Sequence, residues 1–143
     1  MKYLFLTLTF LVFSQVTVSQ SVLGKWKVMK DEETGEVRSI INIYEDEGKV
    51  NGKLIEIMDK SKVDNLCLNC EGENKDKRIL GLVLLKDFEK EQNEYVNGTV
   101  LNPDDGKVYK SKIWIEEDNP NVLNVRGYIG IFYKTMKWRR LLE

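Results

Sequence analysis

The two cysteines of this 143-residue chain stand close together, in the sequence Cys67-Leu68-Asn69-Cys70. In an exported protein this spacing favours a local disulfide that shapes its own loop. A redox-active pair is the alternative, and it would need a βαβ setting with a thiol at a helix start. A structural zinc site normally takes four cysteine or histidine ligands. The chain has two cysteines and no histidine, so we expect no metal site.

The absence of histidine also limits the possible catalytic chemistry. It removes nucleophiles activated by histidine and most catalytic zinc and non-haem iron sites. Carboxylate and lysine chemistry would remain, but no pair of acidic residues stands out from those expected in turns and on polar strand faces. The sequence therefore favours a protein that is not an enzyme, with no catalytic residue and no cofactor.

Aromatic and arginine residues near the two ends of the mature chain form a second group of candidates. In a closed barrel the first and last strands are neighbours, so we expect Trp26 within reach of Arg139 or Arg126, in a cation–π contact at one barrel end. Alternation along the strand lets only one of Trp138 and Arg139 face the interior. These side chains either fill the end of the core, which we favour, or contact a ligand. The barrel-end or ligand-binding candidates are Trp26, Tyr44, Arg126, Tyr128, Trp138 and Arg139.

The elements that would position these residues are strands. Short segments rich in β-branched and aromatic residues alternate with turns that contain a glycine, at Gly35, Gly48 and Gly106. This pattern is typical of antiparallel all-β domains. The expected strands are Lys25–Lys30, Val37–Tyr44, Lys49–Met58, Ile79–Phe88, Glu94–Leu101, Lys107–Glu116, Val122–Tyr128 and Ile131–Leu141. They predict one domain, an up-and-down barrel of about eight strands, with a two-sheet sandwich as the alternative.

Several glycines fall inside or beside the expected strands, at Gly52, Gly81, Gly98 and Gly127. Such glycines mark bends or bulges at the corners of barrels. One connection, Asp59–Arg78, is much longer than the others and contains both cysteines. Loops of this length are uncommon and often functional.

The first residues have the layout of a secretory signal peptide. Lys2 precedes the apolar run Tyr3–Phe13, and the small residues Thr17 and Ser19 suit the positions before a cleavage site. A transmembrane anchor is the alternative, but it needs about 20 apolar residues. We expect a signal peptide over residues 1–19, a mature domain over 20–143 without a transmembrane segment, and export to the periplasm or the extracellular space.

The charge balance limits the partners of the chain. It carries 22 basic and 23 acidic residues, and no run of like charge suggests a nucleic-acid groove or a polybasic membrane surface. We therefore expect no nucleic-acid partner.

A series of short motifs runs in order along the mature chain: Gly24-Lys25-Trp26, Ile41–Tyr44, Gly52–Ile55, Cys67–Cys70, Ile79–Leu82, Asn102–Tyr109, Leu123–Gly130 and Trp138. In these stretches the chain resembles a bacterial exported family, the domain of unknown function 2147, and its start at Gly24-Lys25-Trp26 resembles lipocalin and calycin barrels. Asn102 stands where the family pattern suggests an acidic residue. The resemblance implies export, a small lipocalin-like barrel and paired cysteines, and it implies no reaction.

Three functions follow as hypotheses. The first is a carrier or sensor that binds a small apolar or amphipathic ligand inside the barrel. It requires that side chains such as Ile41, Ile43, Leu54, Ile113 and Val125 leave space in the centre. The second is a binding or scaffold module of the cell envelope that acts through its cysteine loop and has no bound ligand. An enzyme is the third and least supported.

Export carries a direct prediction about the mature protein. The short apolar run and the small residues before Gln20 predict cleavage at residue 19 or 20. The intact mass of the secreted protein should therefore lack residues 1–19 or 1–20. A secreted form that retains its N-terminus would contradict the prediction.

Overall fold

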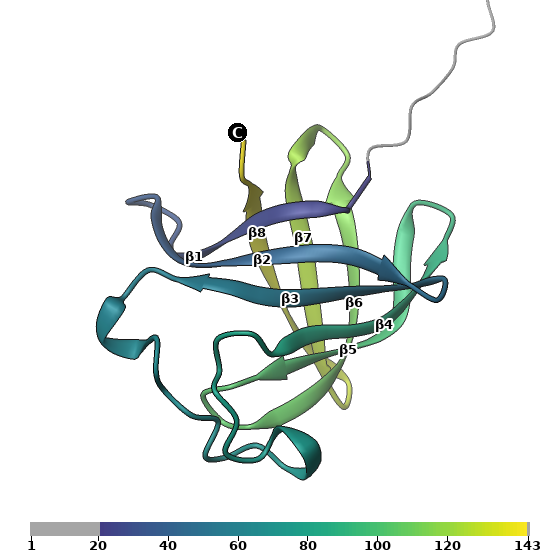
Figure 1. Cartoon of the computed structure of the whole chain (residues 1–143). Coiled ribbons are helices and arrows are strands. Elements are labelled where there is room, and N and C mark those ends of the chain that lie inside the picture. The colour runs from purple at the N-terminus through teal and green to yellow at the C-terminus, as the bar shows by residue number, and fades with distance from the viewer. Residues whose placement is uncertain (1–20, 143) are drawn as a thin grey trace, which may run out of the picture.

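The structure, a computed structural model, describes residues 21–142 as a closed antiparallel barrel in which each strand pairs with the next (Figure 1). The strands are β1 (Gly24–Asp31), β2 (Glu36–Asp46), β3 (Lys49–Ile57), β4 (Val83–Glu91), β5 (Glu94–Asn102), β6 (Lys107–Glu116), β7 (Asn119–Ile129) and β8 (Phe132–Arg140). The predicted up-and-down barrel is confirmed. The predicted signal peptide, residues 1–19, lies outside the described residues.

The turns and most strand boundaries agree with the sequence. Gly35, Gly48 and Gly106 each have a positive φ in a turn between two strands, as hairpin turns require. The fourth strand is an exception, because it begins at Val83 and not at Ile79. Residues 79–82 form a turn instead, in which Gly81 has a φ of +99° and the amide of Leu82 donates to the carbonyl of Ile79 at 3.1 Å. Gly81 therefore bends the loop and not a strand.

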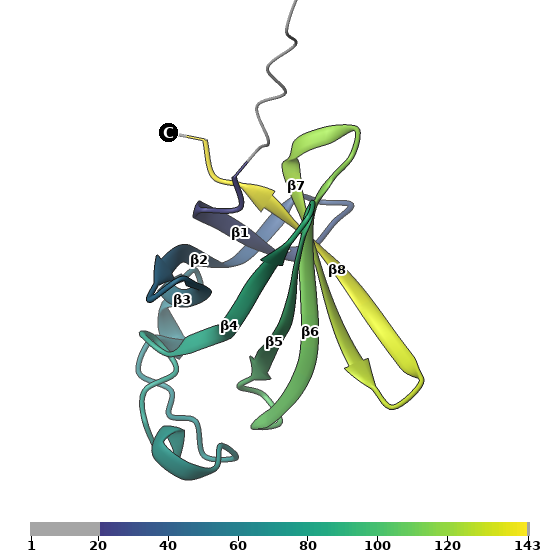
Figure 2. The same cartoon turned by 90° about the vertical axis from the view of Figure 1, so that its right-hand side faces the viewer.

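The long connection between β3 and β4 contains two short 3-10 helices, η1 (Lys60–Lys62) and η2 (Gly72–Asn74). Within residues 21–142 neither helix has the length and apolar character needed to cross a membrane. The connection lies at the same end of the barrel as the β1–β2, β5–β6 and β7–β8 turns, which we call the open end. The opposite end, where β1 starts and β8 ends, is the closed end. In Figure 2 the β7–β8 hairpin and the long connection lie on opposite sides of the open end.

The seam that closes the barrel is short. β1 pairs with β8 at Trp26 with Arg140 and at Lys27 with Arg139, and the amide of Leu141 donates to the carbonyl of Lys25 at 3.0 Å. By contrast, the pairing of β7 with β8 runs from Val122 to Ile129. The barrel is therefore joined at its closed end, and its strands separate toward the open end.

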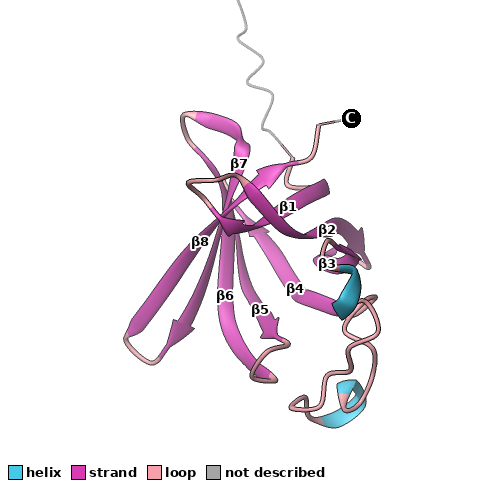
Figure 3. Ribbon diagram, turned by 90° about the vertical axis from the view of Figure 1, so that its left-hand side faces the viewer, coloured by secondary structure: helices cyan, strands magenta, loops and turns pink. Residues whose placement is uncertain are grey.

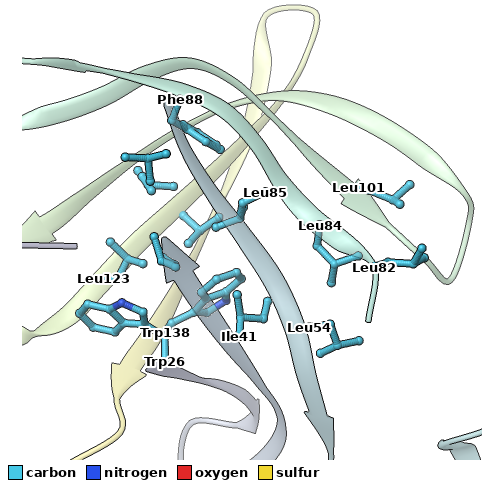
Figure 4. Close-up of a cluster of buried hydrophobic side chains, with 14 of the residues drawn as sticks. Trp26, Ile41, Leu54, Leu82, Leu84, Leu85, Phe88, Leu101, Leu123 and Trp138 are labelled. Atoms are coloured by element: carbon cyan, nitrogen blue, oxygen red, sulfur yellow. The ribbon is translucent and has the colours of Figure 1, made fainter. Parts of the chain in front are cut away.

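The hydrophobic core has two parts: inward side chains fill the closed half of the barrel, and a second group, with Leu82, Leu84 and Leu101 (Figure 4) and the two cysteines, packs between the sheet and the long connection. The inward side chains at the closed end are fully or almost fully buried. They are Trp26, Ile41, Ile43, Leu54, Leu85, Phe88, Ile113, Leu123, Val125 and Trp138.

Gly98 in β5 lies where a side chain would collide with the buried ring of Phe88. A Cβ at Gly98 would lie 2.4 Å from the Phe88 ring, whereas a Cβ at Gly127 would have its nearest neighbour at 3.7 Å. The pairing of β5 with β6 also shifts register between Tyr95 and Gly98. The Phe88 ring therefore occupies the place of a side chain, at a bend in β5.

The close approach predicts opposite outcomes for two substitutions. Gly98→Ala should lower the free energy of unfolding by about 1–3 kcal/mol, because the methyl group overlaps a buried ring. Gly127→Ala should stay within about 1 kcal/mol of the unsubstituted protein, since alanine fits there and restricts the unfolded chain. Urea unfolding measures both, and equal effects would contradict the proposed close contact.

Candidate functional site

The Trp26 side chain anchors the closed end. Its ring is fully buried, and its Nε1 donates to the carbonyl oxygen of Val22 at 2.8 Å. The guanidinium carbon of Arg140 lies 4.3 Å from the ring centroid. The same guanidinium donates to the carbonyl oxygens of Ser21 at 2.9 Å and Pro120 at 3.2 Å. One cation thus joins the segment before β1, the start of β7 and the end of β8.

The predicted cation–π contact of Trp26 is present, but the prediction of its partner was wrong. Because side chains alternate along β8, Trp138 and Arg140 point inward and Arg139 points outward. The Arg139 guanidinium instead lies 3.1 Å from the carboxylate of Glu32. Burial lowers the pKa of Arg140 from its ordinary value. The Nε1 atom of Trp138 is buried and has no hydrogen-bond acceptor among the described residues.

Arg126, the other predicted partner of Trp26, lies on the outer face of the barrel. Its guanidinium stands 4.0 Å from the ring centroid of Tyr133 and 4.9 Å from that of Trp114, and its Nε donates to the hydroxyl of Thr135 at 2.8 Å. Tyr128 lies on the same face, with its ring centroid 6.1 Å from that of Tyr133. Arg126 cannot reach Trp26 because it points away from the interior.

Tyr44 is half-buried on the outer face of β2, since its neighbour Ile43 points into the core. The six predicted site residues therefore do not form one site. Two of them, Trp26 and Trp138, fill the core at the closed end. The other four lie on the outer face and are Tyr44, Arg126, Tyr128 and Arg139.

The inward face has a different character toward the open end, in a region that we call the open half. Val125 is fully buried, but Met136, which pairs with it across β7 and β8, is 37% exposed. Further toward the open end, Phe132 is 72% exposed and its partner Ile129 is 65% exposed. Other inward side chains of the open half are only partly buried, namely Val28, Ile57, Val100 and Tyr109. The open half is thus an apolar inner surface that the barrel does not cover.

Polar groups stand beside this apolar surface. The Tyr109 hydroxyl donates to the Asp105 carboxylate at 2.6 Å. This hydrogen bond holds the pKa of Asp105 below its ordinary value and raises the pKa of Tyr109. Lys134 pairs with Gly127 on the inward side of β8 and is exposed. Within residues 21–142 it forms no ion pair.

The sequence analysis did not single out Arg140 or the residues of the open half. One available signal was the alternation of β8 counted from Trp138, which places Arg140, Met136, Lys134 and Phe132 on the inward face.

The cysteine loop is fixed to the rim of the open end. Cys67 and Cys70 are bonded to each other and buried, so the predicted disulfide is confirmed. The Asn69 amide donates to the carbonyl oxygen of Asp104 at 3.2 Å. A Cβ at Gly106 would lie 1.8 Å from the backbone oxygen of Asn69, so the loop backbone packs directly on the β5–β6 turn.

Substitution of two adjacent arginines, Arg139 and Arg140, distinguishes the effect of the Trp26 contact on stability from that of an exposed charge. Arg140→Ala should cost about 2–3 kcal/mol of unfolding free energy, because it removes the cation–π contact and charged hydrogen bonds to the backbone. Arg139→Ala removes an exposed ion pair and should cost less than about 1 kcal/mol. Trp26→Ala should cost about 3–5 kcal/mol. Chemical unfolding measures all three, and equal effects of the two arginine substitutions would refute the role assigned to Arg140.

Comparisons with known proteins agree with this architecture. A comparison with curated proteins finds no match. The barrel is similar to the solved structure of protein HP1028 from the human pathogen Helicobacter pylori, which is described as belonging to the lipocalin family; the TM-score is 0.71 at 22% sequence identity, over 86% of this chain and 84% of that one. The fold is therefore lipocalin-like. The model of one bacterial family matches residues 24–140, and the chain belongs to that family, described as "Uncharacterized protein conserved in bacteria (DUF2147)".

Proposed function

We propose that this protein is an exported binding protein that holds a small apolar or amphipathic molecule against the open half of its barrel. One observation carries the proposal: inward-facing apolar side chains, Met136 and Phe132 among them, are left exposed to solvent at the open end. Exposed apolar surface of this kind commonly marks a binding site. A ligand that covered it would remove apolar area from water.

The ligand would bind near the mouth of the barrel and not deep inside it. The side chains that the sequence analysis required to leave space in the centre, Ile41, Ile43, Leu54, Ile113 and Val125, are all buried and fill it, so a ligand site at that position is contradicted. An eight-stranded barrel has room for its own side chains or for one small ligand. Here the side chains fill the closed half, and the ligand would lie on the exposed apolar side chains of the open half.

The polar groups of the open half favour an amphiphile with an acidic head. Lys134 is a cation on an otherwise apolar inward row of β8 that includes Phe132, Met136 and Trp138. A carboxylate or phosphate head would gain a charged partner there while the apolar tail lies on Met136 and Val100. Similarity to a lipocalin-family protein supports ligand binding only as an analogy of fold.

A scaffold function through the cysteine loop is the second candidate. Leu66 and Leu68 are exposed on this loop, and the disulfide and the packing on Gly106 hold the loop in place. A fixed loop with exposed leucines suits a protein partner, and this function needs no ligand in the barrel.

A titration with a fluorescent long-chain carboxylate, together with native mass spectrometry of the secreted protein, tests the ligand-binding proposal. We expect saturable binding of one molecule per chain. Gly127→Leu places a side chain in the open half beside Val100 and Tyr109, and it should weaken binding about tenfold or more.

Thr99→Leu is the matched control, since Thr99 pairs with Lys110 on the outer face. It should leave binding unchanged. If the folded protein carries no molecule and does not bind the probe, or if Gly127→Leu and Thr99→Leu bind alike, the ligand site is not in the open half. The scaffold function would then be favoured.

A further inference from the structure

The tip of the β7–β8 hairpin, residues 129–133, is the most exposed apolar segment of the described chain. Ile129 is 65% exposed, Ile131 90%, Phe132 72% and Tyr133 60%. Gly130, which turns the chain, has a φ of +58°. In Figure 3 the hairpin projects beyond the body of the barrel, apart from the cysteine loop.

Ligand binding in the open half would cover only part of this tip. Ile129 and Phe132 pair on the inward face, whereas Tyr133 pairs with Tyr128 on the outer face and Ile131 lies in the turn. The tip is therefore apolar on both faces. Something other than a ligand inside the barrel is needed to remove Ile131 and Tyr133 from water.

The charged residues of the β7–β8 hairpin are all positive, whereas the acidic Asp105 stands on the neighbouring β5–β6 turn and accepts a hydrogen bond from Tyr109. From Asn119 to Leu142 the sequence contains no acidic residue, and it contains five basic residues, Arg126, Lys134, Lys137, Arg139 and Arg140. Nearest the tip stand Arg126 and Lys134 on the hairpin and Lys110, which pairs with Tyr128 from β6. None of these three cations forms an ion pair with a residue of the described chain. The cations are separated in the sequence, so no run of like charge reveals them.

We propose that the hairpin tip docks the protein on an anionic lipid bilayer. Ile131, Phe132 and Tyr133 would enter the boundary between headgroups and acyl chains, with Arg126, Lys134 and Lys110 at the level of the anionic headgroups. From the Tyr128–Tyr133 pair, one step along the strands reaches the Ile129–Phe132 pair and one more reaches the turn with Ile131, about 7 Å in all, which lies within the depth that interfacial segments reach. Aromatic rings and cations beside an apolar tip suit this position.

The positive charges of the hairpin favour a bilayer over a second copy of the chain. Two hairpins packed tip to tip would bring unpaired cations of the same sign together, which is unfavourable. An anionic bilayer supplies opposite charge and an apolar interior in one surface. Docking through the tip would also bring the open end toward the membrane, because both lie at the same end of the barrel.

Flotation with lipid vesicles tests the docking, using the folded secreted protein. Binding is expected to vesicles of equal parts phosphatidylglycerol and phosphatidylcholine, and it should weaken at high salt and with phosphatidylcholine alone. The double substitution Ile131→Ser with Tyr133→Ser should weaken binding about tenfold or more. Lys110→Gln, on the outer face and outside the ligand site, should weaken it about fivefold. Neither Ile131 nor Tyr133 faces the open half, so ligand binding should be retained in the double variant, and the two proposals can fail separately.

The matched control removes similar side chains at the closed end. Leu142, 70% exposed, and Tyr44 are replaced by serine, and vesicle binding should stay unchanged. As a probe of insertion, Ile131→Trp should shift its fluorescence to the blue on vesicles, whereas Leu142→Trp should not. Circular dichroism verifies that each variant is folded.

Three results would overturn the docking proposal. One is a folded protein that does not bind the anionic vesicles. Another is a tip variant that binds them as well as the control variant. The third is a protein that forms a dimer dependent on Ile131 and Tyr133 and binds no vesicles, which would assign the tip to self-association.

Discussion

The contact between Arg140 and Trp26 is the constraint on which the closed barrel depends. Two residue pairs join β1 to β8, which is little backbone pairing to hold the first and last strands together. The Arg140 guanidinium strengthens this seam, because it stacks on the Trp26 ring and donates hydrogen bonds to the backbone carbonyls of Ser21 and Pro120. Charged hydrogen bonds are stronger than neutral ones, so a single side chain stabilises a junction that the sheet itself leaves short.

The short seam also explains why the two halves of the barrel differ. Near the seam, Trp26, Trp138 and Leu123 belong to one buried hydrophobic cluster, from which water is excluded. Beyond the seam, β8 remains paired with β7 but separates from β1. The inward side chains there have fewer neighbours to cover them. The exposure of Met136 and Phe132 follows from this separation. A binding surface and a packed core are thus built from the same inward rows of the same strands.

The sequence predicted the architecture well because turn glycines and alternating strands are local signals. Gly35, Gly48 and Gly106 marked hairpin turns correctly. Ile79–Leu82 was misassigned to a strand, since its apolar composition resembles β4, and only the contacts of Gly81 and Leu82 with the loop and β3 show the turn.

The candidate site was harder to predict than the fold. Trp26 was expected beside an arginine, but the neighbour depends on the register between β1 and β8, which connects residues at opposite ends of the chain. Arg126 and Tyr128 were candidates because arginine and tyrosine often contact ligands, but their positions in β7 place them on the outer face of the barrel. The exposure of Phe132 and Ile129 could not be predicted, because apolar residues at alternating strand positions are ordinarily assigned to the core.

The short seam has a further consequence for the behaviour of the protein at high concentration. Where β8 runs from Phe132 to Lys137 without β1 beside it, its outer backbone groups form an edge, and an open edge can accept a strand from another molecule. Lysines on such an edge oppose that pairing, because each would be brought next to the same charge on the incoming strand. Lys134 and Lys137 stand in this stretch. These two lysines therefore oppose fibril-like association of β8, which the apolar side chains of the same strand would otherwise promote.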